Sequence, residues 1–293
     1  MDYIIHILII ISIFVPLALS LDLLVGRTGI LSITHAGMYG LGAYTTAILT
    51  KTYGVSFLTS VAVGILVTVC ASYMLSKVLS RLKGDYYTLG SFGANIILFS
   101  LFMNLTPLTG GPMGIFNIPQ AVIFGIPVTS TLAFLLVSLV FMCLVIIFMQ
   151  MITTSRFGLI IQAIRDDTLA TEVFGYNVKD FKTVAFVISA SIASIAGSLY
   201  STYISFIDPS SFTLNESIFM LTMIIIGGFA SKRGAIFGAV FVILLPELLR
   251  FVGLPDSIAA QLRVAIYGAI LMYLMYKKPT GVFGNYTPGK HIT

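Results

Sequence analysis

The sequence predicts an all-α fold, a bundle of helices that crosses a membrane many times. Of its 293 residues, 58% are hydrophobic and 9% are charged, and the mean hydropathy is +1.03. A soluble domain has about a quarter of its residues charged, so this chain has too few charges to cover a water-exposed surface. Apolar runs about 20 residues long recur along it, the length at which a helix crosses a bilayer core. The runs do not alternate apolar and polar residues, so they do not predict a membrane barrel.

About nine apolar segments are expected to enter the membrane, and together they make residues 1–293 a single transmembrane domain. They cover residues 4–25, 30–50, 55–76, 87–106, 121–150, 183–206, 214–231, 235–251 and 258–276. The second and seventh are rich in glycine, serine and threonine, so one or both are expected to be broken or re-entrant helices. The fifth is long enough to extend beyond the membrane. The N-terminus lacks the basic start of a signal peptide, which predicts a retained first helix.

Lysine and arginine indicate the orientation, because they concentrate in cytoplasmic loops. With nine spans and a cytoplasmic C-terminus, only Lys51, Arg250 and Arg263 fall outside. The inner loops then hold Arg27, Lys77, Arg81, Lys83, Arg156, Arg165, Lys179, Lys182, Lys232, Arg233, Lys277, Lys278 and Lys290. This bias predicts an outer N-terminus, which would change sides if one segment only dips into the membrane. The net charge of +5 thus reflects the topology of the chain and does not indicate that it binds nucleic acid.

Residues 151–182, called the elbow below, form the longest hydrophilic stretch and are predicted to lie in the cytoplasm. One apolar face repeats at helical spacing, formed by Phe157, Ile160, Ile161 and Ile164. A second short helix can be capped by Asp166, Asp167 or Thr168 and can end at Gly175. Such a pair of helices suits docking into a groove of a partner. An interfacial helix that lies on lipid has the same pattern, and both interpretations remain open.

The glycines and hydroxyls between residues 26 and 45 suggest an unwound helix that lines a cavity, where transporters often bind substrate. The candidate pathway residues are Ser32, Thr34, His35, Gly37, Tyr39 and Gly40. His35 is expected to make a structural hydrogen bond, since His6 and His291 lie in other regions. No metal site is expected in this chain.

Two further features have both a structural and a functional interpretation. The rigid turn at Thr109, Gly110, Gly111 and Pro112 is either a plain turn or a lip of an outer gate that contacts a substrate-delivery protein. Glu247 lies near the end of a span, where an ion pair with Arg250 or Arg263 is the favoured interpretation.

Other classes of function fit the sequence less well. No Walker A motif is present, so an ATPase that drives this protein has to be another chain. An ion-driven carrier usually needs acids near the midplane, which are sparse here. A prenyltransferase needs two acidic clusters for Mg²⁺, and Asp166-Asp167 is the only adjacent acidic pair.

Several motifs follow one another along the chain. Gly29 to Ala36 is an early motif, and Leu82-Lys83-Gly84-Asp85-Tyr86 precedes the fourth expected span. Further motifs are Leu108 to Pro112, Ala163 to Asp167, Phe174 to Tyr176, Lys182, Phe186 to Ala190 and Lys278 to Gly284. In this order they resemble the branched-chain amino acid ABC transporter permease family, most of all its M-type subunit, and the resemblance covers almost the whole chain from about Leu19 onward.

The resemblance implies a transport subunit that is not an enzyme, in a bacterial cytoplasmic membrane. A second homologous permease subunit, two cytosolic ATPases and an extracytoplasmic substrate-binding protein are the implied partners, besides lipid. ATP and Mg are expected on the ATPases, with no cofactor on this chain. The elbow would contact an ATPase through Ala163, Arg165, Asp166, Asp167, Thr168, Glu172 and Gly175. The expected cargo is a branched-chain or related small polar amino acid, with urea or a short amide as alternatives.

Overall fold

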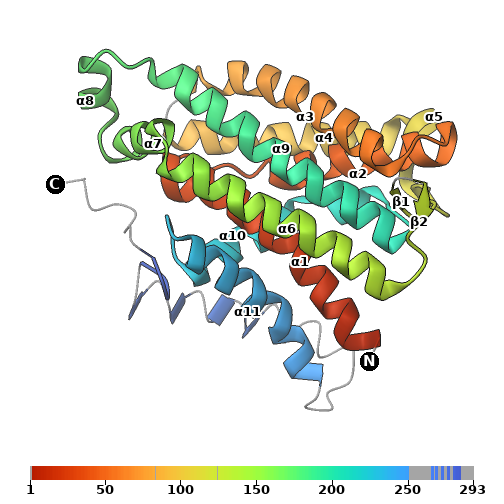
Figure 1. Ribbon diagram of the computed structural model, residues 1–293. Coiled ribbons are helices and arrows are strands. Elements are labelled where there is room, and N and C mark those ends of the chain that lie inside the picture. Colours follow the sequence, from red (N-terminus) through yellow and green to blue (C-terminus); the bar gives the residue numbers. More distant parts are fainter. Residues whose placement is uncertain are drawn as a thin grey trace.

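The computed structural model describes residues 2–82, 84–123 and 125–250, and beyond these residues 265–266, 268–269, 272–273, 276–277 and 280–284. Long helices lie side by side in one bundle (Figure 1). They are α1 (Asp2–Asp22), α2 (His35–Tyr53), α3 (Phe57–Leu79), α4 (Asp85–Asn104), α6 (Thr131–Thr154), α9 (Val178–Ile204) and α11 (Lys232–Arg250), with the shorter α10 (Leu214–Gly227).

Short elements join the long helices. The helical ones are the π-helix η1 (Leu23–Arg27), α5 (Thr106–Thr109), the 3-10 helix η2 (Gly111–Met113), α7 (Arg156–Asp166), α8 (Thr168–Val173) and the 3-10 helix η3 (Pro209–Phe212). Strands β1 (Val122–Ile123) and β2 (Ile126–Pro127) pair in antiparallel fashion. This small sheet is the one described departure from the expected all-α fold.

Within the part of the chain that the structure describes, five helices are long and apolar enough to cross a membrane, namely Tyr3–Arg27, Phe57–Leu79, Asp85–Asn104, Thr131–Thr154 and Val178–Ile204. The glycine-rich α2 is not among them, yet most of its residues are buried, chiefly against α9 and α3. Other helices of the same chain enclose α2, so it does not need an apolar surface toward lipid. The chain is a multi-pass helical membrane protein.

Close backbone packing holds α2 against α9 at the centre of the bundle. A Cβ on Gly197 would lie 2.0 Å from the Tyr39 carbonyl oxygen, and one on Gly42 would lie 2.2 Å from that of Ser194. The Thr46 hydroxyl donates to Ser198 Oγ over 2.7 Å. Small residues therefore let these two backbones touch, as helices in lipid commonly do.

Each expected segment up to residue 251 overlaps a described helix, but α2 and α6 begin well after the expected residue. α2 starts at His35 instead of residue 30, because residues 29–34 are not helical. α6 starts at Thr131 instead of residue 121, because Gly125 has a φ of +82° and Pro127 belongs to β2. The segment 258–276 lies almost wholly outside the described residues, so the count of nine stays a prediction.

The elbow lies at one end of the bundle, whereas α5, β1 and β2 lie at the opposite end, as does the N-terminus (Figure 1). Lys51 belongs to that opposite end, where its Nζ donates to the Phe116 carbonyl over 2.5 Å. Arg27 and Lys232 belong to the elbow end. Lys51 thus lies at the opposite end from Arg27 and Lys232, as the charge bias predicts. Lys83, Arg263, Lys278 and Lys290 lie outside the described residues. Which end faces the cytoplasm stays a prediction.

Candidate functional site

A break in the helical backbone follows α1 and η1. The Ile30 amide donates to the Leu24 carbonyl over 3.0 Å, and Gly29 has a φ of +71°. Residues 29–34 then run without helical structure to the start of α2. The predicted unwound segment is therefore present, although it is shorter than the glycine-rich stretch suggested.

Side chains of other helices accept from amides at the start of α2 and in the segment just before it. Asn95 Oδ1 accepts from the Gly37 amide at 2.9 Å, Ser217 Oγ from the Ala36 amide at 3.0 Å, and Ser91 Oγ from the Ile33 amide at 3.0 Å. The first amides of a helix have no intrahelical partner, so polar side chains that accept from them stabilise its start. Here α4 and α10 supply the acceptors that fix α2 deep in the bundle.

His35 is held by two serines. Its Nε2 lies 2.8 Å from Ser20 Oγ of α1 and 3.4 Å from Ser189 Oγ of α9, and the side chain is buried. These contacts match the expected structural hydrogen bond. Among the described residues, no three metal-ligating side chains come together.

All six candidate pathway residues lie together and are buried: Ser32, Thr34, His35, Gly37, Tyr39 and Gly40. A Cβ on Gly37 would lie 2.5 Å from Leu98, and one on Gly40 would lie 2.6 Å from Phe102, so α4 packs directly on this face. The Tyr39 hydroxyl is buried without a hydrogen-bond partner among the described residues. By contrast, Leu31 within the break is 44% exposed. A role of the six in a pathway stays a prediction.

The elbow forms the two predicted helices, each with a polar cap. Ser155 Oγ accepts from the Gly158 amide at the start of α7, and Asp167 Oδ1 accepts from the Ala170 amide at the start of α8. Gly175, with a φ of +88°, follows the end of α8. The apolar face of α7 packs inward, with the Phe157 ring stacked on that of Phe181 at 5.7 Å.

The outer surface of the elbow is both apolar and acidic. Leu169, Val173 and Phe174 are 73%, 86% and 82% exposed. Around them lie the exposed residues Ala163, Asp166, Asp167, Glu172 and Gly175. Thr168 is half-buried and donates to the Ile164 carbonyl over 2.9 Å. Most of the residues predicted to contact a partner are thus accessible.

Arg165 differs from these residues, because its side chain points into the chain and is only 10% exposed. Its Nη1 donates to the Gly26 carbonyl over 2.9 Å, and its Nε and Nη2 both lie 2.9 Å from Asp166 Oδ1. The prediction that Arg165 contacts an ATPase is not tested by this position. The contact does connect the elbow directly to the end of α1.

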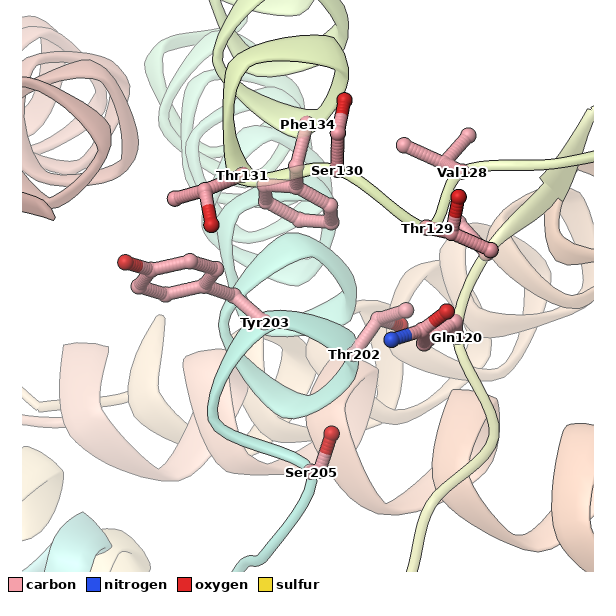
Figure 2. A pocket seen from close by; sticks show the side chains of 10 residues that line it. Gln120, Val128, Thr129, Ser130, Thr131, Phe134, Thr202, Tyr203 and Ser205 are labelled. Carbon is pink, nitrogen blue, oxygen red and sulfur yellow. The ribbon is translucent and has the colours of Figure 1, made fainter. Parts of the chain in front are cut away.

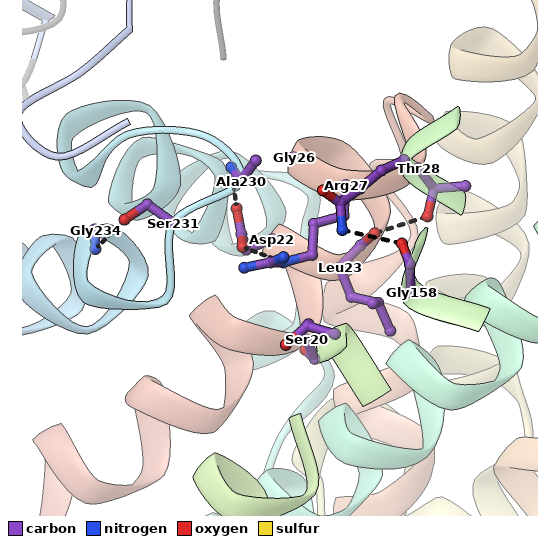
Figure 3. Close-up of polar contacts among 12 residues, drawn as sticks. Ser20, Asp22, Leu23, Gly26, Arg27, Thr28, Gly158, Ala230, Ser231 and Gly234 are labelled. Carbon is purple, nitrogen blue, oxygen red and sulfur yellow. Dashed lines mark hydrogen bonds and ion pairs between the residues drawn. The ribbon is translucent and has the colours of Figure 1, made fainter. Parts of the chain in front are cut away.

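A buried polar cluster surrounds Gly26 (Figure 3). Asp22 Oδ1 accepts from the Ala230 amide at 2.8 Å, and Asp22 Oδ2 lies 3.4 Å from Arg27 Nε. Ala230 lies in the turn between α10 and α11. Three distant parts of the chain, the end of α1, the elbow and this turn, therefore meet at Gly26.

The predicted outer lip is folded against a second segment, residues 205–213. The Ile115 amide donates to the Ile207 carbonyl over 2.8 Å, and the Ile207 amide donates back over 3.1 Å. Thr109 is buried and its hydroxyl donates to the Phe102 carbonyl over 2.7 Å, whereas Gly110 has a φ of +75°. The turn is therefore rigid, and its contact with a delivery protein stays a prediction.

A pocket of about 120 Å³ lies near this lip (Figure 2). Hydroxyl and amide side chains dominate its lining, which is Gln120, Ala121, Val128, Thr129, Ser130, Thr131, Phe134, Thr202, Tyr203 and Ser205. The pocket has no charged residue in its wall, and the sequence analysis did not identify it.

The favoured ion pair of Glu247 with Arg250 or Arg263 stays a prediction. Tyr3 donates its hydroxyl to the Glu247 carboxylate, while Arg263 and the side chain of Arg250 lie outside the described residues. The caps of α2, Ser91, Asn95 and Ser217, were missed. Of these three residues, only Asn95 could have been noticed in the sequence, because it is an amide side chain within an apolar run.

A multi-pass helical bundle with a break in its helical backbone beside an exposed helical elbow has the architecture of a membrane transport subunit. The family model described as "Branched-chain amino acid transport system / permease component" matches residues 3–275. The chain therefore belongs to this family, whose members are transport permease subunits and not enzymes.

Curated relatives extend over most of the chain. The high-affinity branched-chain amino acid transport system permease protein LivM of Escherichia coli (strain K12) is 30% identical over 92% of this chain and 67% of its own length. The permease protein BraD of Pseudomonas aeruginosa is 24% identical over 94% of this chain and 92% of its own. A probable LivM of Methanocaldococcus jannaschii is 25% identical over 69% of this chain and 61% of its own. No solved structure matches.

Proposed function

We propose that this chain is the permease subunit of an ATP-driven importer for branched-chain or related small polar amino acids. It would form the pathway with a second homologous permease subunit in a bacterial cytoplasmic membrane. Two cytosolic ATPases would hold ATP and Mg, and an extracytoplasmic binding protein would deliver the substrate. The family and the named functions of the relatives support the substrate class.

The exposed surface of the elbow is the observation that carries the proposal. Leu169 and Val173 of α8, and Phe174 at its C-terminal cap, are largely exposed among the described residues. A helix that lies on anionic lipid presents lysine and arginine beside its apolar face. Here Asp166, Asp167 and Glu172 lie beside it, so the charges favour a protein groove over a lipid surface.

The remaining candidate residues have roles in the same scheme. Ser32, Thr34, His35, Gly37, Tyr39 and Gly40 would line or shape the pathway at the helix break. Thr109, Gly110, Gly111 and Pro112 would form the lip that meets the binding protein. Ala163 and Thr168 would add contacts at the rim of the ATPase groove.

A co-purification experiment tests the proposal. The tagged chain is expressed in its native host, extracted in mild detergent, and its partners are identified by mass spectrometry. We expect two ATPases and a second permease of similar size. The double variant Leu169→Ser/Phe174→Ser should lose the ATPases but keep the second permease, because only the docking surface is changed.

Leu108→Ser is the matched control, since Leu108 is 56% exposed at the opposite end of the bundle. This variant should keep both ATPases and the second permease. Radiolabelled leucine, with urea as competitor, then identifies the cargo in liposomes that contain the complete complex. Transport by the isolated chain, driven by an ion gradient without ATP, would contradict the proposal and establish a secondary carrier.

A further inference from the structure

Gly26 lies in the last turn of η1, and its carbonyl can accept from Arg165 because no later amide of a continuing helix takes it. In a continuous α-helix the Gly26 carbonyl would accept from the Ile30 amide. Here that amide donates to the Leu24 carbonyl, and the Gly26 carbonyl accepts from Arg165 Nη1 at 2.9 Å instead. The elbow thus takes the place of the missing turn of α1.

The geometry around Arg165 leaves little freedom. Asp166 Oδ1 lies 2.9 Å from both Nε and Nη2, which orients the planar guanidinium toward Gly26. On its other side, a Cβ on Gly29 would lie 2.9 Å from Arg165 Cγ. A charge-assisted hydrogen bond shielded from water resists separation better than an exposed one.

Gly26 also connects the elbow to the turn between α10 and α11. A Cβ on Gly26 would lie 2.2 Å from Asp22 Oδ1 and 2.5 Å from the Ala230 amide. Because Gly26 has no side chain, the Asp22 carboxylate can reach that amide at 2.8 Å. A displacement of Gly26 must therefore act on Asp22, and through it on Ala230.

We infer that Arg165 is a positioning residue that carries movement of the elbow into the helix break at residues 26–34, and so couples the ATPases to the pathway. The inference rests on the proposed function of the elbow. Residues 29–34 can change their backbone angles without breaking a helical ladder, as hinges do. The elbow and residues 26–31 would move as one body, and α2 would move relative to them.

The first test compares leucine uptake with ATP hydrolysis in the complete importer, reconstituted in liposomes with its binding protein. Arg165→Gln should keep both ATPases bound and should keep their hydrolysis. It should increase the ATP hydrolysed per leucine about tenfold, in the range of typical coupling free energies. Arg165→Lys, which retains one charged donor, should recover part of the coupling.

Arg156→Gln is the matched control, because Arg156 is exposed at the other end of α7. Its ATP-to-leucine ratio should equal that of the native chain. If Arg165→Gln loses the ATPases, Arg165 is a docking contact, and if its ratio stays native, Arg165 is a merely structural residue. Either result overturns the inference and leaves the proposed function standing. If the native complex takes up no leucine when ATP is supplied, the proposed function itself is overturned.

A second test measures the joint movement directly. Spin labels at Leu159→Cys on α7 and Leu31→Cys in the break are placed in a chain whose exposed cysteines, Cys70 and Cys143, are replaced by serine. In the native background the label-to-label distance should be unchanged between the nucleotide-free and the vanadate-trapped complex. In Arg165→Gln it should change on trapping. A distance that changes equally in both backgrounds would overturn the inference.

Discussion

Asn95 Oδ1 accepts a hydrogen bond from the Gly37 amide at 2.9 Å, and this bond joins α4 to the first turn of α2. Asn95→Leu keeps the volume but leaves that buried amide without an acceptor. We expect the free energy of unfolding to fall by about 1–3 kcal/mol. Thermal unfolding of the purified chain in detergent measures this.

The control for Asn95 is Asn104→Leu at the end of the same helix. The Asn104 side chain is exposed and donates only to the Ser100 carbonyl of its own helix, so this variant should unfold near the native temperature. Equal unfolding temperatures for Asn95→Leu and the native chain would contradict the prediction that Asn95 stabilises the start of α2.

Gly197→Ala tests the contact between α2 and α9. The added methyl would lie 2.0 Å from the Tyr39 carbonyl oxygen, which is backbone and cannot turn away. Forcing the helices apart should lower the free energy of unfolding by about 1–3 kcal/mol or more. Gly93→Ala is the matched control in a helix interior, because nothing lies within 4 Å of its Cβ.

In the isolated chain Gly93→Ala should leave stability unchanged or raise it by about 0.5–1 kcal/mol, since alanine favours the helix. Unfolding in dodecyl maltoside with increasing sodium dodecyl sulfate separates the two variants. A similar loss of stability in both variants would mean that the close α2–α9 contact does not determine the effect of Gly197→Ala.

The apolar runs predicted the helices well because lipid leaves few alternatives to helical structure. Their starts were harder to predict. Residues 121–130 are apolar enough to continue the fifth segment, yet Pro127 and Gly125 interrupt it, and Ser130 caps α6 by accepting from the Ala133 amide. Within the elbow, local signals were sufficient, and Asp167 caps α8 as expected.

The candidate site could be predicted only in part. Gly37 and Tyr39 were identified from local composition, and they do lie at the helix break. The partners of the break could not be identified, because Asn95 and Ser217 reach it from other helices. Arg165 was predicted only as a contact to an ATPase, and its hydrogen bond to Gly26, 139 residues away in sequence, was not predicted. Periodicity within one helix does not indicate which neighbour a side chain meets.

Asp22→Asn should be strongly destabilising. Both side chains of the Asp22–Arg27 pair are almost fully buried, and asparagine would leave Arg27 without its counter-charge. Losing one partner of a buried pair typically costs about 3–5 kcal/mol. The double variant Asp22→Asn/Arg27→Met should lose less stability than the sum of the losses in the two single variants. Strict additivity in this thermal double-mutant cycle would show that the pair does not interact.

Gly114→Ala should separate the outer lip from residues 205–213. Gly114 has a φ of +72°, and a Cβ there would lie 2.1 Å from the Ile207 carbonyl oxygen. With a ψ of −164°, Gly114 is in a region that essentially only glycine adopts, so the variant combines backbone strain of about 1–3 kcal/mol with a clash. The two amides that join the segments, those of Ile115 and Ile207, should exchange with deuterium much faster.

Gly125→Ala is the control for Gly114, because it has a similar φ of +82° but nothing lies within 4 Å of its Cβ. It carries the strain without the clash, so exchange at Ile115 and Ile207 should stay native. Equal exchange in both variants would show that the positive φ, and not contact with Ile207, determines the effect. Faster exchange in Gly114→Ala alone would show that the lip depends on the fit between these two backbones.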